Sequence, residues 1–171
     1  MKIYGKHGYA RDVIDSDILE LSINPRSVDS RHSKHLGWKN HKEHVAMTFA
    51  NSIRAISFCL KDGTLIASVG VNPSDKERVG HVWILGSKNS VDILKRKGKL
   101  KKISGRIGVA RGAYEFMRAS KDHFNWLFGS EFDHLVNIIE TGNSLGHRWV
   151  KFLGASIQKH DSKFSKVIFS K

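Results

Sequence analysis

The sequence predicts one α/β domain, spanning residues 1–171, in which helices flank a mixed central sheet. Apolar, strand-like runs at 55–60 and 65–71 alternate with stretches whose apolar residues recur every three or four positions, as in amphipathic helices. Asp62-Gly63 between the two runs is a hairpin signal, so part of the sheet is expected to be antiparallel. A chain of 171 residues is long enough to bury one sizeable core.

The first half of the chain is expected to contain strands and two helices. Ile18 and Leu21 mark the first helix, which Pro25 interrupts because proline cannot continue it. Apolar residues at +4 spacing, Val45, Phe49 and Ile53, mark the second helix. In chain order we expect a strand at 9–13, the first helix from 15, a polar stretch at 27–39, the second helix at 45–53, a hairpin at 55–71 and a strand at 80–86.

The segment from Lys95 to Lys121 is predicted to be a long helix that concentrates positive charge. Its apolar residues recur at alternating +3 and +4 spacing, and it holds ten Lys or Arg residues against one acid. We expect its basic stripe to contact DNA or another polyanion; the alternative is a solvated basic face that touches nothing in particular. The stripe consists of Lys95, Lys99, Lys102 and Arg106.

The whole chain is strongly basic, with a net charge of +13 and a pI near 10. Phosphate groups attract such a surface independently of sequence, so nucleic acid is the first partner class to consider. A soluble basic protein, or one that docks on an acidic protein surface, is the alternative. The single Cys59 excludes an internal disulfide, and no apolar run is long enough to span a bilayer. We therefore expect neither conventional export nor a membrane span.

The most informative stretch runs from Asp133 to Ala155 and predicts a strand, a helix cap, an amphipathic helix and a glycine stop. An apolar run at 134–139 leads to Asn143, which can cap a helix. Gly154 stands at the position after the helix, where a positive φ is common and glycine is favoured. The helix is expected to bury one face that carries Leu145, Trp149 and Phe152.

This last unit resembles the strand–helix unit of the GNAT acetyltransferase fold. In that fold an Asn after the strand opens a helix that ends near a Gly-aromatic or Gly-apolar pair, as Asn143 and Gly154-Ala155 do here. Arg11 and Asp17 also match an Arg of the first strand followed by an Asp of the first helix. The order of elements along almost the whole chain is similar. The resemblance implies a GNAT-like fold.

A narrower resemblance is to a family of small internal virion proteins from short-tailed phages, whose members have a GNAT-like fold without an assigned reaction. It is carried by residues 62–70, 81–86 and 143–155. It implies a component of the phage head, in contact with other virion proteins, that is ejected with or ahead of the genome. The implied locations are the virion and, during assembly, the host cytoplasm.

Acetyltransferase activity depends on a phosphate-binding loop, Arg/Gln-x-x-Gly-x-Gly/Ala, in which backbone N–H groups hold the coenzyme A phosphates. Residues 86–90, directly after the strand, lack that spacing. Residues 105–110 match it at Gly108 and Ala110, but the first position is Gly and the segment lies within the periodic helix. Helix packing is the alternative role for these two residues.

The helix after Asn143 is where the acetyltransferase pattern places a Tyr that protonates the departing thiolate. That position holds Val150, which has no proton to donate. His81 is a candidate base on the preceding strand, with a purely structural role as the alternative. No cofactor is required by the sequence. If the chain is an enzyme, acetyl-coenzyme A is expected between the strands around Leu85 and Val136, with Leu85, Gly86, Gly108, Ala110 and Asn143 as binding residues.

No metal site is expected. His32-x-x-His35 and His41-x-x-His44 have the spacing of zinc ligands on one helical face, but no Cys or third ligand accompanies them. Ten histidines in a basic chain make such pairs common.

Three functions remain open at the level of sequence. We favour a non-catalytic virion protein, an internal capsid, core or DNA-ejection component on an acetyltransferase-like scaffold. The first alternative is an active N-acetyltransferase that uses acetyl-coenzyme A. The second is a basic DNA-binding phage protein that acts on host machinery.

Overall fold

The computed structural model describes residues 3–4, 8–89, 120–121 and 123–171. Most of the predicted helix from Lys95 to Lys121 therefore lies outside the described residues. So do all four residues of the basic stripe, together with Gly108 and Ala110.

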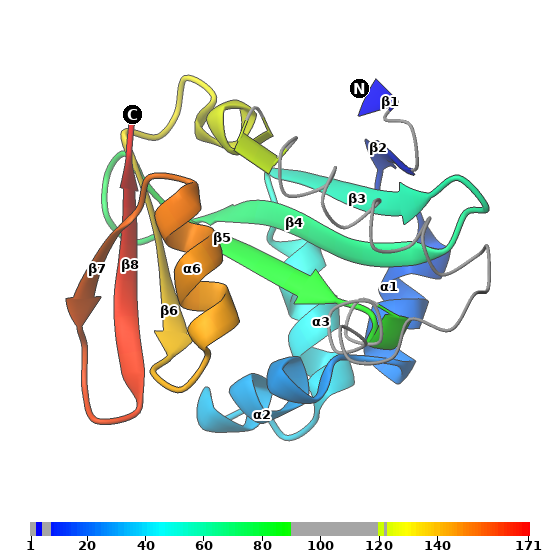
Figure 1. Cartoon of the computed structure of the whole chain (residues 1–171), viewed down its shortest axis with the longest axis horizontal. Helices are drawn as coiled ribbons and strands as arrows, with labels where there is room; N and C mark the ends of the chain where they lie inside the picture. The colour runs from blue at the N-terminus through cyan, green and yellow to red at the C-terminus, as the bar shows by residue number, and fades with distance from the viewer. Residues whose placement is uncertain (1–2, 5–7, 90–119, 122) are drawn as a thin grey trace, which may run out of the picture.

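A mixed sheet forms the centre of the fold, as predicted, and it has eight strands (Figure 1). Its strand order is β1-β2-β3-β4-β5-β6-β8-β7. Among the described strands, β5 and β6 are the parallel pair and every other neighbouring pair is antiparallel. The strands are β1 Ile3–Tyr4, β2 Gly8–Asp12, β3 Arg54–Leu60, β4 Leu65–Pro73, β5 Val79–Gly86, β6 His134–Glu140, β7 Ser156–Lys159 and β8 Phe164–Ser170.

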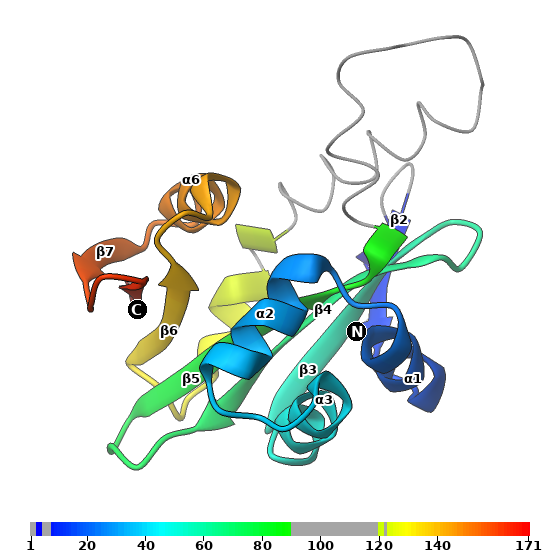
Figure 2. The same cartoon turned by 90° about the horizontal axis from the view of Figure 1, so that it is seen from below.

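Helices cover both faces of this sheet (Figure 2). Leu21 of α1 and Val45 of α3 pack with Leu85 of β5 on one face. Val150 of α6 and the helical residues 123–128 pack with Val82 of β5 on the other. Within the described residues, no helix is both long enough and apolar enough to cross a membrane. The labelled helices are α1 Asp15–Ile23, α2 Ser27–His35, α3 His41–Ala50 and α6 Ser144–Phe152.

The first strand and the first helix are joined by a buried ion pair between Arg11 and Asp17. The guanidinium donates both to Oδ2 and, at 2.7 Å, to Oδ1 of Asp17, which is only 3% exposed. Burial alone favours the neutral acid, but hydrogen bonds from Arg11, Ser57 and the backbone N–H of Ile14 lower the pKa of Asp17. Arg11 and Asp17 are the two residues that match the start of the GNAT pattern, and in the structure they contact each other.

Helix α2 is the main departure from the predicted fold. The polar stretch at 27–39 contains no apolar period, yet Ser27–His35 is helical. Asp29 and Ser33 are its buried residues, so the helix is attached through polar contacts rather than through an apolar stripe. Helix α3 also ends earlier than predicted, because Ile53 lies beyond Ala50 and is 48% exposed.

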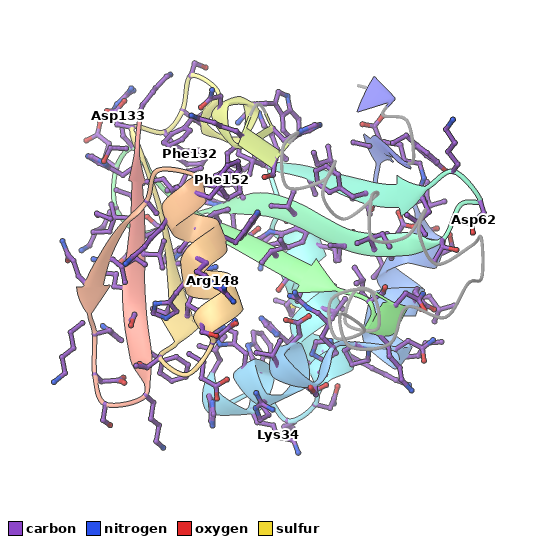
Figure 3. The ribbon with its side chains drawn as sticks, viewed as in Figure 1. Lys34, Asp62, Phe132, Asp133, Arg148 and Phe152 are labelled. Atoms are coloured by element: carbon purple, nitrogen blue, oxygen red, sulfur yellow. The ribbon has the colours of Figure 1, made fainter. Side chains whose placement is uncertain are left out.

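The unit from β6 to α6 forms as predicted. Asn143 Oδ1 accepts the N–H of Gly146 at 2.9 Å, and Gly154 follows the helix with a φ of 92°. The expected buried face is only partly correct, because Phe152 is half exposed and lies one turn from the exposed Arg148 (Figure 3). Leu153 and Val150 supply the buried contacts instead.

Gly70 of β4 allows the Trp83 ring to lie flat against the sheet. The two residues are opposite each other in the β4–β5 register. A Cβ on Gly70 would collide with the Trp83 ring and lie 2.6 Å from the carbonyl oxygen of Arg54. The Trp83 indole N–H donates to Asn72 Oδ1 at 2.9 Å and to Ser52 Oγ at 3.0 Å, so the ring cannot move without breaking these bonds.

We expect Gly70→Ala to lower the free energy of unfolding by about 1–3 kcal/mol, the usual cost of overpacking a filled core. Gly142→Ala is the matched control, because a Cβ there meets nothing within 4 Å. Urea denaturation of both variants checks the prediction. Equal midpoints for the two variants would show that the Trp83 ring moves freely.

Candidate functional site

A cleft of about 620 Å³ lies where β5 and β6 separate. The parallel pairing of the two strands comprises three residue pairs and ends at His81 and Val136. Strand β5 continues to Gly86 and β6 to Glu140, so each strand runs on without the other as a partner. Residues of α2, α3, β5, β6 and α6 line the opening.

The backbone of β5 presents an open edge to this cleft. Ser87 donates its N–H to Ile66 on β4, and the register places Leu85 in the same orientation. Because successive residues of a strand direct their backbone groups to opposite edges, Ile84 and Gly86 direct theirs away from β4 and toward the cleft. The separation of the strands therefore leaves backbone groups that need other partners.

Side chains satisfy two of the backbone groups that the separation exposes. The N–H of Ile138 on β6 donates to the side-chain oxygen of Asn137 at 2.7 Å. The N–H of Gly86 donates to Asp29 Oδ2 at 2.8 Å, and the Gly86 carbonyl accepts from the N–H of Arg26 at 3.1 Å. Ile84 lies on the edge of β5 between His81, where the pairing with β6 ends, and Gly86. Its amide faces the interior of the cleft.

A latch formed by Arg26, Asp29 and Gly86 attaches the start of α2 to the end of β5. Arg26 donates twice to the Asp29 carboxylate, with both distances 2.8 Å. The Arg26 side chain covers Gly86 so closely that no Cβ would fit there. Asp29 thus accepts from a guanidinium and a backbone amide at once, which explains how a carboxylate that is 8% exposed is accommodated.

The other end of α2 reaches β6 and β8. Arg31 contacts Glu140 at 3.2 Å, and the rings of His32 and His35 meet the edge of Phe164 at 5.8 and 5.5 Å between centroids. Helix α2 therefore bridges the two sides of the separated strands.

A hydrogen-bonded group of Ser33, His41 and His44 supports the α2 and α3 wall of the cleft. Ser33 Oγ lies 2.7 Å from Nδ1 of both histidines, and His41 Nε2 lies 3.1 Å from the carbonyl oxygen of Leu21. Burial, together with the nearby His32 and His41, lowers the pKa of His44 to about 4. Burial likewise lowers the pKa of His32. Both imidazoles are uncharged at neutral pH.

Helix α6 supplies the opposite wall. Asn143, Gly146, Trp149 and Val150 line the cleft, and Val150 is 4% exposed. The Trp149 ring packs edge-on against Phe124 at 5.7 Å, which holds this wall against the core. The wall presents an aliphatic group where the acetyltransferase pattern has a phenol.

The structure gathers several of the sequence-predicted site residues in one place. His81, Leu85 and Asn143 line the cleft, and Gly86 lies at its edge in the latch. Leu85 also packs into the core with Leu21 and Val45. His81 is exposed at the point where the strands part.

Sequence reasoning missed the contribution of α2, including Asp29, Arg31 and Ser33. A helix without apolar periodicity gives no hydropathy signal. The paired histidines at 32–35 and 41–44 were the one sequence signal for this wall of the cleft, but their spacing is typical of a metal site and gave no indication of the hydrogen bonds that they make here. No group of three or more metal ligands occurs among the residues that the structure describes.

Comparison with solved structures identifies the fold. An acetyltransferase from Agrobacterium tumefaciens aligns over 100% of this chain and 95% of its own, with a TM-score of 0.62 and 12% identity. A GNAT-family acetyltransferase from Bacillus anthracis aligns over 100% and 98%, with a TM-score of 0.57 and 9% identity. This chain has the GNAT acetyltransferase fold.

A third similar GNAT-fold structure, Campylobacter jejuni N-acetyltransferase PseH, was solved in complex with acetyl-coenzyme A. It aligns over 96% of this chain and 99% of its own, with a TM-score of 0.50 and 11% identity. No family model matches this chain, and no curated protein matches it by sequence. Nothing in these comparisons indicates the phage virion family that the sequence resembles.

The lowered pKa of His44 predicts acid-sensitive stability. The unfolded chain takes up a proton at this residue near pH 6.5, the ordinary histidine value, whereas the folded chain does so only near pH 4. The stabilisation is therefore complete above about pH 6.5 and is lost as the pH falls toward 4. We expect the melting temperature of the native protein to fall across this window more steeply than that of His44→Asn.

Thermal melts followed by circular dichroism at pH 7, 6, 5 and 4 check this prediction, with substitution of the exposed His160 by Asn as the control. The His160 variant should follow the native curve. Parallel curves for the native protein and the His44 variant would contradict the assignment of a buried neutral imidazole.

Proposed function

We propose that the chain binds an acyl-coenzyme A in the cleft between β5 and β6 and transfers its acyl group to an amine. The open edge of β5 at the strand separation carries this proposal. The GNAT fold over the full length of the chain supports it, since the similar structures are described as acetyltransferases. The acetyl-coenzyme A complex of PseH supports the choice of donor.

The chemistry of the donor fits the cleft. The pantetheine arm of coenzyme A is extended and carries two amides, so it can pair with the backbone of an unpaired strand as another strand would. Ile84 offers its N–H and carbonyl on that edge. The apolar side chains of Ile138 and Val150 line the same opening and suit the aliphatic parts of the arm.

Transfer requires an amine nitrogen to attack the thioester carbonyl. A carbon–nitrogen bond forms, the carbon–sulfur bond breaks, the coenzyme leaves as a thiolate and the nitrogen loses a proton. His81, exposed where the strands part, is placed to accept that proton directly or through water. Val150 cannot protonate the thiolate, so in this proposal the thiolate takes its proton from solvent.

The predicted roles of Gly108, Ala110 and the stripe beginning at Lys95 stay predictions, because these residues lie outside the described part of the chain. The virion interpretation, with other virion proteins and DNA as partners and the phage particle as location, also stays a prediction. Mass spectrometry of purified particles tests that interpretation independently of coenzyme binding.

We expect acetyl-coenzyme A to bind with one-to-one stoichiometry in calorimetry at moderate salt. Moderate salt is needed because a charge of +13 attracts polyanions at low ionic strength. Tripolyphosphate is the control for nonspecific attraction. Heats that are identical for tripolyphosphate and acetyl-coenzyme A would contradict the proposal.

Ile84→Pro tests the strand edge, because proline lacks the N–H that faces the cleft and no bond to β4 depends on that N–H. We expect the affinity for acetyl-coenzyme A to fall about fivefold to tenfold, the range for one lost hydrogen bond. Ile84→Ala is the matched control, since it shortens the side chain and keeps the amide. Equal affinities for the two variants would show that the amide does not contact the donor.

A further inference from the structure

Among the described residues, neither carboxylate that lines the cleft is free. Asp29 of α2 is paired with Arg26, and Glu140, at the end of β6, is paired with Arg31. The remaining polar groups on the α2 and α3 wall include the imidazoles of His32 and His44, which burial keeps neutral. A positively charged ligand would therefore find nothing here to balance its charge.

Hydrogen bonds orient the ring of His44. The carbonyl of Leu21 can only accept, so His41 donates from Nε2 and, when neutral, accepts at Nδ1. Ser33 Oγ has one proton and faces two acceptors, Nδ1 of His41 at 2.7 Å and the carbonyl oxygen of Asp29 at 3.0 Å. Whichever of the two receives that proton, Ser33 must accept from Nδ1–H of His44. This assignment leaves a lone pair on Nε2 of His44.

That nitrogen is available to a ligand. His44 lines the cleft, and its Nε2 makes no hydrogen bond within the described part of the chain. Trp38 stacks on the His44 ring at 5.4 Å and 23°, which fixes the plane of the imidazole. Leu36 and Trp83 add apolar surface to the same cleft. The wall thus combines a fixed, uncharged hydrogen-bond acceptor with flat apolar surroundings.

We propose that this wall binds the acyl acceptor, and that the acceptor is a weakly basic amine on an aromatic ring, which donates an N–H to Nε2 of His44. This inference rests on the proposed acyl transfer and specifies its substrate class. An aromatic amine is uncharged at neutral pH because the ring delocalises its lone pair. It needs neither a carboxylate to hold a cation nor a base to free its nitrogen before attack.

Proton transfer also favours this class. As the nitrogen attacks, it becomes positively charged and must release a proton. The nitrogen of an attacking aromatic amine becomes strongly acidic, so for this class of substrate the weak base His44 can accept the proton in place of His81 and pass it to solvent. An aliphatic ammonium ion holds its proton far more tightly, and His44 is too weak a base to remove it.

The test compares para-toluidine with benzylamine, two isomers that differ in whether the nitrogen is attached to the ring. Release of coenzyme A thiol from acetyl-coenzyme A is followed with each amine at pH 7.5. We expect kcat/KM to be at least about tenfold higher for para-toluidine, a difference of about 1.4 kcal/mol. Equal rates, or faster turnover of benzylamine, would overturn the inference.

Two variants separate the role of His44 from that of the fold. His44→Asn retains a donor at the position of Nδ1 and removes the acceptor at Nε2, so it should lower the preference for para-toluidine. His44→Gln places an amide near the position of Nε2 and should retain part of it. A preference that survives unchanged in His44→Asn would contradict the proposed contact.

A binding measurement distinguishes this inference from the proposed function. The nitrogen chemical shifts of the His44 imidazole are recorded by NMR as para-toluidine or benzylamine is added, without any donor. A saturable shift with para-toluidine alone supports the inference even if calorimetry shows no acetyl-coenzyme A binding, in which case only acyl transfer fails. No shift, with acetyl-coenzyme A bound normally, overturns the inference and leaves the proposed function intact.

Discussion

Strands β5 and β6 pair over three residues and then part, and the candidate site is a consequence of that separation. Each strand is held on its other side, β5 by β4 and β6 by β8, so neither can turn to satisfy its exposed backbone. Buried N–H and carbonyl groups need partners. Asn137 supplies one to β6 and Asp29 supplies one to β5. Between them, the edge at Ile84 is open to a ligand.

Helix α2 forms one wall of the cleft between β5 and β6. It is anchored at one end by the Arg26–Asp29 pair on Gly86 and at the other by the contact of Arg31 with Glu140. The same contacts pair both carboxylates that line the cleft, Asp29 on α2 and Glu140 on β6, and burial keeps the imidazoles of His32 and His44 neutral. The contacts that attach α2 to the separated strands are therefore also the ones that leave no free carboxylate in the cleft. In the proposed site, this disfavours a positively charged acceptor.

Much of the fold could be predicted because its signals are local. The Asp62-Gly63 turn, the Asn143 cap and the Gly154 stop each act within a few residues, and each forms as expected. Helix α2 could not be predicted, since its buried polar residues depend on distant partners: Asp29 accepts a hydrogen bond from the N–H of Gly86, and Ser33 is hydrogen-bonded to the α3 histidines. Those partners are far away in the sequence, and no apolar period marks them. The half-exposed Phe152 shows the same limit, because spacing alone does not reveal which apolar residues meet the core.

Hydrogen exchange of the protein with and without acetyl-coenzyme A, at moderate salt, tests most directly whether the strand separation is a donor-binding site. We expect slower exchange of the Ile84 amide, which faces the cleft, and no change at the Leu85 amide, which already pairs with β4. Slower exchange confined to the outer surface of the protein, with Ile84 unchanged, would show that the donor does not bind at the strand separation.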